Sequence, residues 1–172
     1  MLAPALCHGA AGADNTIARV ELGANAFYRV YLEARPSGVP PAKTRAKFSP
    51  VISSSLADVL QRAEAAERHY RKVTKNQVPP LVEGDLFTSL FEGATSFKVG
   101  PCTGDTKAGS CTISLTYSEP KQKPQTWNDM VLLVNTPAGW KVDDIAYKAG
   151  FQFGNSGKLS DTLKFVVSDA TQ

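Results

Sequence analysis

The stretch TWNDMVLLVNTPAGWKVDDI, residues 126–145, decides the fold class. Its side chains follow a period of two on both sides of a turn that contains proline and glycine, which predicts strands at about 127–136 and 139–147. Upstream, ATSFKVGPC (94–102) and CTISLTYS (111–118) predict two further strands. The connections are rich in Gly, Pro, Lys and Asp, as hairpin loops are. The second half of the chain is therefore predicted to form an antiparallel meander.

The first half has a helical period instead. From Thr16 to Glu33 apolar residues recur at the i, i+3, i+4, i+7 spacing of an amphipathic helix, which Asn15 or Asp14 caps. The prolines and glycine of ARPSGVPPAK (34–43) end it. A second helix is expected after the three serines at 53–55, any of which can be the N-cap. Its predicted apolar face consists of Leu56, Val59, Leu60, Ala63, Tyr70 and Val73.

Helices followed by a meander indicate a single α+β domain, residues 14–172, with its helices packed on one face of a curved antiparallel sheet. The last segment, Leu159 to Val167, fits either a short helix or a final strand. With 172 residues and 42% hydrophobic content, the chain is long enough to bury one core and too short for two comfortable domains.

The net charge of +3 comes from 19 basic residues scattered among 16 acidic ones. Nucleic acid is not expected as a partner, because binding its backbone needs a clustered basic face. After the first thirteen residues, no segment approaches the roughly 20 apolar residues of a membrane span, so no span is expected.

The first thirteen residues, MLAPALCHGAAGA, carry no charge and end in Ala-Gly-Ala before Asp14. This is typical of a signal-peptidase site, although the charged n-region is missing, so we interpret the stretch as the second half of an export signal. A disordered tail rich in Ala and Gly is the alternative. A periplasmic or secreted location follows from the first interpretation.

Apart from Cys7, the cysteines are Cys102 and Cys111, with eight residues between them and strand-like sequence on both sides. Opposed residues of antiparallel strands lie within the range that a disulfide bridges. We therefore expect a cross-strand disulfide, which fits an oxidising compartment. Two reduced, buried cysteines are the alternative. A zinc site is not expected, since His69 would bring the ligands to only three, at the wrong spacing.

Three segments together resemble a bacterial family of secreted proteins catalogued as a domain of unknown function: FYRVYL (27–32), VEGDLF (82–87) and the hairpin 126–145. That family is similar to the nuclear transport factor 2-like fold, in which a bent sheet and a few helices form a cone. The resemblance covers about residues 20–147 and implies the cone architecture. It implies no activity, because this fold hosts isomerases, dehydratases, ligand binders and interaction modules.

Asp143 and Asp144 are the residues that most resemble a catalytic or metal-binding pair. In a regular strand, adjacent side chains point to opposite faces and cannot converge on one ligand. If Ile145 returns to the core, a bulge near the two aspartates is needed, and a bulge re-aims side chains. Acid/base chemistry would need partners such as Glu83, Asp85 or Asp129, which the sequence does not bring together. We interpret the two aspartates as groups that cap or solvate the end of a strand.

Other catalytic signals are weak. His69 lies beside the apolar face of its helix without an identifiable nucleophile, and the three serines are better explained by helix capping. There is neither a phosphate-binding loop nor a dinucleotide fingerprint, so no cofactor and no metal are expected. Eight aromatic residues either fill the interior or line a small-ligand pocket: Phe27, Tyr28, Tyr31, Phe87, Phe91, Phe97, Trp127 and Trp140.

Two polar loops, 103–110 and 119–125, are candidate contact sites. The first is closed by the expected disulfide and the second contains two prolines, and a loop held in its bound shape loses less entropy on association. The partner-binding candidates are Asp105, Thr106, Lys107, Lys121 and Lys123.

These features favour an exported, non-enzymatic protein-binding module. By analogy of size and compartment, an immunity protein that inhibits a secreted cell-wall hydrolase is one example. The alternative is a periplasmic small-ligand binder that uses the interior of the cone. An isomerase or dehydratase is disfavoured for want of a second catalytic group, and homodimer formation stays open.

Overall fold

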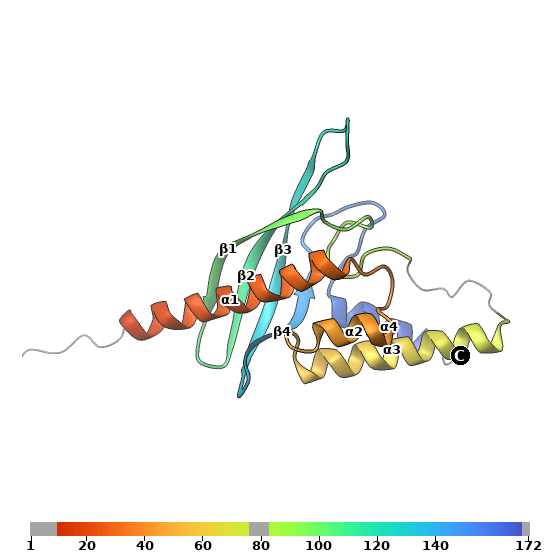
Figure 1. The fold of residues 1–172 in the computed structure, drawn as a ribbon, viewed down its shortest axis with the longest axis horizontal. Coiled ribbons are helices and arrows are strands. Elements are labelled where there is room, and N and C mark those ends of the chain that lie inside the picture. Colours follow the sequence, from red (N-terminus) through yellow and green to blue (C-terminus); the bar gives the residue numbers. More distant parts are fainter. Residues whose placement is uncertain (1–9, 76–82, 170–172) are drawn as a thin grey trace, which may run out of the picture.

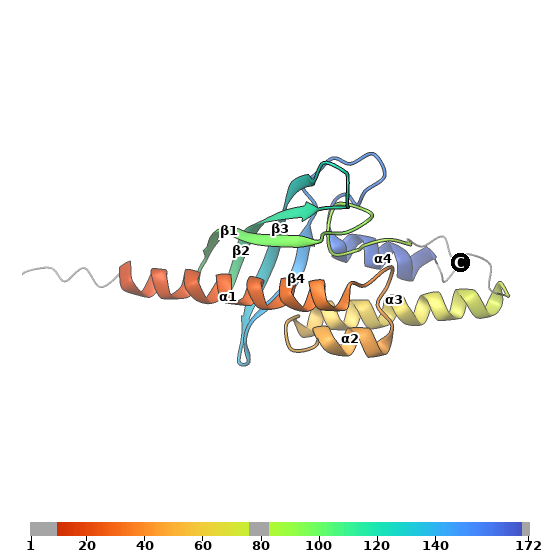
Figure 2. The same ribbon diagram turned by 45° about the horizontal axis from the view of Figure 1, so that its top comes forward.

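Four strands pair in sequence order, β1-β2-β3-β4, into one antiparallel sheet, because a short connection joins each strand to the next. The computed structural model describes residues 10–75 and 83–169. The elements along the chain are α1 (Ala10–Ala34), α2 (Ala42–Phe48), α3 (Ser54–Val73), β1 (Ser96–Gly104), β2 (Ala108–Tyr117), β3 (Gln125–Thr136), β4 (Gly139–Ala146) and α4 (Leu159–Asp169). Figure 1 shows α1 lying across the sheet, and Figure 2 shows α2 and α3 below α1. The start of α3 lies next to β4, since Ser53 N donates to Val142 O at 2.8 Å.

The sheet presents alternate side chains to α1. The residues that face the helix are buried, among them Ile113 and Leu115 of β2, Val131 and Leu133 of β3, and Val142 and Ile145 of β4. The helix meets them with Val20, Ala24, Phe27 and Tyr28, all fully buried at the i, i+4, i+7, i+8 spacing of one helix face. Burial of this shared apolar surface is the main term that holds the two layers together.

A glycine sets the distance between α1 and the sheet. A Cβ at Gly23 would lie 2.9 Å from both Trp140 Cβ and a methyl carbon of Leu133. Any larger residue would have to push the helix away from β3 and β4.

The aromatic side chains form a packed interior. The rings of Phe48 and Phe87 stack at 5.0 Å, and Phe27 lies 5.7 and 5.8 Å from them. Phe27 also meets Tyr28 edge-on at 5.1 Å. The aromatic residues near α1 therefore act mainly as core. Phe91 departs from this pattern, since its side chain is 45% exposed.

β4 contains a bulge at the two aspartates. Leu132 pairs with Asp144 and Leu133 pairs with Val142, so Asp143 is the extra residue. The extra residue reverses the alternation, and both Val142 and Ile145 reach the core face with no exposed surface. Of the two arrangements that the sequence left open, regular alternation and a bulge that returns Ile145 to the core, the structure has the second.

Most predicted elements are confirmed, with shifted ends. The α+β class and all four strands are present, and the segment at 159–167 is helical. The first helix begins at Ala10, earlier than predicted, so Asp14 and Asn15 lie inside it and the expectation that one of them is its N-cap was wrong. The rest of the expected export signal, residues 1–9, lies outside the described residues.

Two expectations were wrong in detail. Helix α2 was not predicted, because its seven residues are too short to show a period. Val73 was assigned to a buried face but is 59% exposed, since the end of α3 extends beyond the elements that pack on it (Figure 1).

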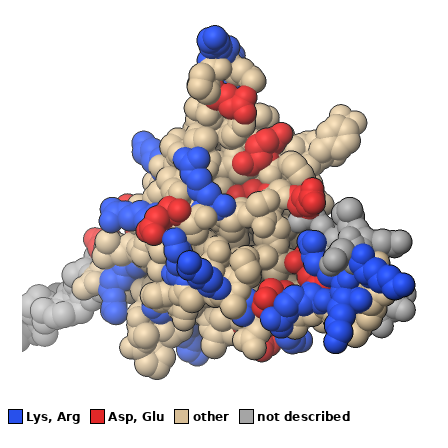
Figure 3. Space-filling model, turned by 45° about the vertical axis from the view of Figure 1, so that its right-hand side comes forward, with Lys and Arg blue, Asp and Glu red and all other residues tan. Residues whose placement is uncertain are grey.

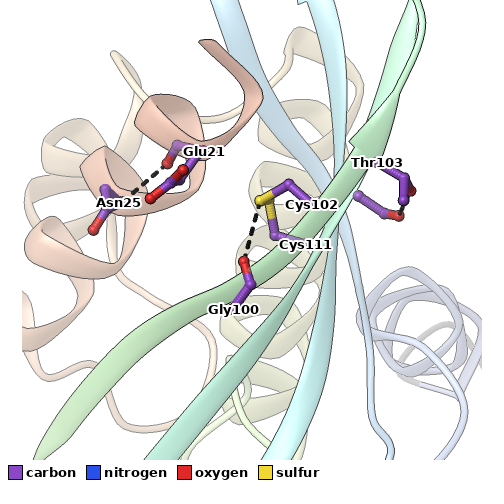
Figure 4. Close-up of a disulfide and its surroundings, with 7 residues drawn as sticks. Glu21, Asn25, Gly100, Cys102, Thr103 and Cys111 are labelled. Carbon is purple, nitrogen blue, oxygen red and sulfur yellow. Dashed lines mark hydrogen bonds between the residues drawn. A yellow bond between two sulfur atoms is a disulfide. The ribbon is translucent and has the colours of Figure 1, made fainter. Parts of the chain in front are cut away.

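The expected disulfide joins Cys102 of β1 to Cys111 of β2. The two residues are direct partners in the strand register, with Cα atoms 4.1 Å apart. Figure 4 shows the bond on the side of the sheet that faces α1, where Glu21 and Asn25 lie. It follows an irregularity between Val99 and Cys102 where regular β1–β2 pairing is interrupted. The disulfide therefore closes a ladder that is weakened at this point.

Reduction of the disulfide should lower the free energy of unfolding by about 2 to 3 kcal/mol, because it releases a short closed loop in the unfolded chain. Urea unfolding of the full chain with and without a phosphine reductant measures this difference. The double variant C102S/C111S should not respond to the reductant. Equal midpoints for the wild-type protein under both conditions would contradict the expectation.

Candidate functional site

Asp144 is a structural anchor for α4. Its Oδ1 accepts the backbone N–H of Ser160 at 3.0 Å, and its Oδ2 accepts the Ser160 hydroxyl at 2.7 Å. Because Ser160 lies in the first turn of α4, this carboxylate satisfies a helix N–H group that has no partner within the helix. Asp144 also accepts the N–H of Ile145 at 2.9 Å and is 8% exposed.

Asp143 points to a different helix. Its Oδ1 accepts the hydroxyl of Ser53 at 2.6 Å, while Ser53 Oγ accepts the N–H of Leu56 at 3.0 Å as the N-cap of α3. The capping role expected for the serine run is confirmed at Ser53. Asp143 and Asp144 therefore diverge towards two helix N-termini and do not form a paired acid/base site.

Replacement of Asp144 by Ala should destabilise the fold by about 1 to 3 kcal/mol, because it leaves the partly buried donors of Ser160 and the buried N–H of Ile145 without this carboxylate. The neighbouring variant Asp143→Ala is the matched control. It removes one bond from a partly exposed carboxylate and should cost about 1 kcal/mol or less. Chemical denaturation measures both, and equal effects would contradict the different roles assigned to them.

His69 and loop 103–110 give no catalytic arrangement. The His69 side chain is exposed on α3.

Asp105 shapes its own turn, since its Oδ1 accepts the N–H groups of Lys107 at 2.7 Å and Ala108 at 3.0 Å. These bonds, from Ala108 first and Lys107 second, lower the pKa of the Asp105 carboxyl. Replacing Asp105 would therefore change the loop itself, whereas the exposed side chain of Lys107 can be changed without removing a turn contact.

The structure places the two predicted contact loops at opposite ends of the sheet. Loop 103–110 lies beside the β3–β4 turn, where Asn135 Nδ2 donates to Thr106 O at 2.9 Å and Asn135 N donates to Lys107 O at 2.8 Å. Lys121 and Lys123 lie in the β2–β3 hairpin loop, which projects at the top of Figure 1. A single protein–protein interface of standard size would therefore be centred on one of these loops and not on both.

The end that carries Lys121 and Lys123 also contains a groove. It has a volume of about 450 Å³ and opens to solvent. Its lining comes from the end of α1, the loop at 83–95 and the end of β2: Tyr31, Arg35, Pro36, Ser37, Glu83, Gly84, Asp85, Phe91, Glu92, Ala94, Thr95 and Tyr117. Figure 3 shows acidic side chains following one another below the basic tip of the molecule.

Asp85 and Tyr31 form a hydrogen-bonded pair in the groove, and the pKa values of both side chains are raised. The Tyr31 hydroxyl donates to Asp85 Oδ2 at 2.6 Å and accepts the N–H of Ala94 at 2.8 Å, while Asp85 Oδ1 accepts the N–H of Phe87 at 2.7 Å. Burial raises the pKa of the Asp85 carboxyl to about 7, and these hydrogen bonds offset only part of that rise. Burial, with the Asp85 charge second, also raises the pKa of the Tyr31 phenol.

Two glycines make this arrangement possible. Gly93 has φ +80°, and a Cβ there would lie 2.7 Å from Asp85 Oδ2 and 2.8 Å from the Tyr31 hydroxyl oxygen. Gly84 has φ +120°, and a Cβ there would lie 2.5 Å from the ring of Phe91. The loop 83–95 therefore depends on glycine at both positions to close over Tyr31.

Asp129 holds this loop from beneath. It is fully buried, and its carboxylate accepts the N–H of Ser89 at 2.7 Å, the Ser89 hydroxyl, the indole N–H of Trp127 at 3.1 Å and the N–H of Lys148 at 2.9 Å. A buried carboxylate with several donors fixes the segments that supply them. Asp129 thus joins the loops at 83–95 and 147–155.

A second, apolar groove of about 220 Å³ adjoins the first. It is lined by Leu90, Phe91, Glu92, Phe151, Gln152, Phe153 and Gly154. Phe91 and Glu92 line both grooves, and Glu92 and Tyr117 also line a third, of about 290 Å³, beside Glu119 and Lys123. The three grooves are therefore continuous through the residues that they share.

Asp85 and Phe91 are candidate residues in the sequence, but no pattern connects them. No pattern indicates Tyr31 as a partner of Asp85 or Phe153 as a surface residue. The available signal was the glycine at each end of the segment GDLFTSLFEG (84–93). Tyr31 and Asp85 lie 54 residues apart, so no local spacing reports their contact.

Within the described segments, no three His, Cys, Asp or Glu side chains are placed to hold a metal ion. None of the described helices has the length and apolar character required to cross a bilayer. Comparison with known protein families, curated proteins and solved structures finds no match for this chain.

The raised pKa of Asp85 predicts a pH dependence of stability. The folded protein binds a proton on Asp85 more tightly than the unfolded chain does, so this contribution is fully present below about pH 4 and is lost as pH rises through about 7. The wild-type protein should therefore lose stability relative to Asp85→Asn between pH 4 and 7, by on the order of a few kcal/mol. Thermal unfolding of both proteins across this range measures the difference, and a constant difference would disprove the assignment.

Proposed function

We propose that this chain is an exported, non-enzymatic protein-binding module whose fold is the cone of the nuclear transport factor 2-like class. The four-stranded antiparallel meander with α1 across one face supports that fold assignment. The Cys102–Cys111 disulfide supports export, because structural disulfides persist in oxidising compartments.

The observation that carries the proposal is the surface at the β2–β3 end of the sheet. There the three connected grooves lie next to an exposed hairpin loop and two exposed phenylalanines, Phe91 and Phe153. Exposed aromatic side chains surrounded by polar groups are characteristic of protein interfaces. Their fixed supporting loops reduce the entropy cost of association.

The class of partner that we propose is a secreted cell-wall hydrolase, with the chain acting as an immunity protein that blocks it. Support comes from the compartment, the size of the domain and the projecting hairpin. Lys121 and Lys123 lie on that hairpin and are exposed. A projecting loop beside a groove is suited to covering the substrate cleft of an enzyme.

A small-ligand-binding role is the second candidate. The groove at Asp85 and Tyr31 has a volume of about 450 Å³, within the range of small-molecule sites. This site differs from the interior pocket predicted from the sequence, since it lies at the end of the sheet. The protein-binding role is preferred because exposed aromatic surface extends well beyond this groove.

The full chain should form a complex with a secreted hydrolase from its source organism and inhibit cell-wall hydrolysis in proportion to its concentration. The variant K121A/K123A should weaken the complex about five- to tenfold, because two charges at the rim of the interface are lost. Affinity purification with mass spectrometry identifies the partner, and turbidity loss of purified cell walls measures inhibition.

The matched control is Lys107→Ala at the opposite end of the sheet. It should leave affinity unchanged, and all variants should keep the wild-type melting temperature. Weakening by K107A instead of K121A/K123A would move the interface to the other loop. Absence of any hydrolase complex would disprove the immunity role.

A further inference from the structure

Two phenylalanines from distant parts of the chain are exposed over the same apolar groove. Phe91 is 45% exposed and Phe153 is 83% exposed, and both line the 220 Å³ groove together with Leu90 and Phe151. Single exposed apolar residues are common on protein surfaces, but aromatic residues that share a groove mark an interaction site.

The loop that carries Phe153 is fixed in place. Asn155 Nδ2 donates to Asp85 O and to Thr88 O, each at 2.6 Å, and Asn155 N donates to Ser89 O at 2.9 Å. Gly154 N also donates to Phe151 O at 3.3 Å. These bonds hold loop 151–155 against loop 85–89, so the groove between them is preformed.

The polar groups beside these phenylalanines are mainly acidic. The three connected grooves are lined by three exposed acidic residues and two basic ones: Glu83, Glu92 and Glu119, with Arg35 and Lys123. Asp85 also lines the first groove, but it is buried against Tyr31. Glu92 is exposed and lines all three grooves, next to Phe91. The chain as a whole has a net charge of +3, so the acidic excess is a local property of this surface.

We infer that the groove formed by Phe91, Phe151 and Phe153 docks a segment of a partner protein in which an aliphatic side chain lies next to an arginine or lysine. This inference rests on the proposed protein-binding function and adds the chemistry of the partner's contact segment.

Each half of such a segment has a complement on the surface. The aliphatic side chain enters the apolar groove and removes the exposed phenylalanine surface from water, which supplies most of the affinity. The neighbouring cation faces Glu92 and the carboxylates beyond it, and the ring of Phe91 also attracts a cation at its face. Charge complementarity at Glu92 selects a basic contact segment over an acidic one in this groove.

The proposal can be tested with two synthetic peptides and the isotope-labelled full chain. One hexapeptide alternates leucine and arginine, and the other alternates leucine and glutamate. Amide shifts in a titration should saturate with the arginine peptide and map to residues 83–95 and 151–155. The glutamate peptide should bind at least about tenfold more weakly, because it places like charges opposite Glu92.

Two pairs of variants locate the site. Phe153→Ser should weaken binding of the arginine peptide at least about fivefold. Phe165→Ser, which removes a 59% exposed phenylalanine from α4, should leave this affinity unchanged. Glu92→Gln should weaken it about two- to fivefold, whereas Glu21→Gln on α1 should not. Melting temperatures of all four variants verify that the fold is kept.

Several results would overturn the inference. Equal binding of both peptides would do so, as would shifts that map to the last turn of α3, which carries Arg71 and Lys72. Absence of saturation at millimolar peptide, or a concentration-dependent dimer that buries Phe153 and excludes the peptide, would also contradict it. A hydrolase complex that is unaffected by F153S and E92Q would also overturn it, but would leave the proposed function intact. Loss of the hydrolase complex itself contradicts the proposed function, while specific peptide binding would still support this groove.

Discussion

The bulge in β4 is the constraint on which the placement of the helices depends. One extra residue at Asp143 keeps Val142 and Ile145 on the core face and directs the two neighbouring carboxylates to different helices. Asp144 holds the first turn of α4, and Asp143 holds the Ser53 cap of α3. A regular strand would place one of the two apolar residues outside the core. The pair that looks like a catalytic site is therefore part of the framework.

Two buried carboxylates build the surface at the other end of the sheet. Asp129 binds Ser89, Trp127 and Lys148, while Asp85 binds Tyr31 and Phe87. Burial disfavours the charged form of a carboxylate, and the raised pKa of Asp85 reflects this free-energy penalty. Together the two carboxylates hold the loops at 83–95 and 147–155 against the sheet. Phe91 and Phe153 are exposed because these loops are fixed, which connects the polar network to the proposed interface.

The residues that stabilise the fold and those of the proposed binding surface are thus different groups. The layer of α1 against the sheet, the disulfide and the anchors in β4 maintain the fold. The groove residues Glu92, Phe91 and Phe153 lie at the surface, where they add little to the core and remain accessible to a partner. A surface of this kind can change its specificity through a few side chains while the framework stays the same.

The sequence by itself determined the α+β class, the four strands, the main helices, the disulfide and the serine cap. Each of these rests on local information: a period of two or of 3.6, a turn residue, or two cysteines at hairpin spacing. The sequence showed that a bulge is needed if Ile145 joins Val142 in the core, and the structure decided that it does.

Only the tertiary structure decided where the polar residues of the grooves meet. The Tyr31–Asp85 bond and the shared groove of Phe91 and Phe153 join segments that are 54 and more than 60 residues apart. Tertiary packing also separated the two candidate loops to opposite ends of the sheet and left Val73 exposed. Periodicity reports which face of an element is apolar, whereas the partner of that face depends on how the elements pack.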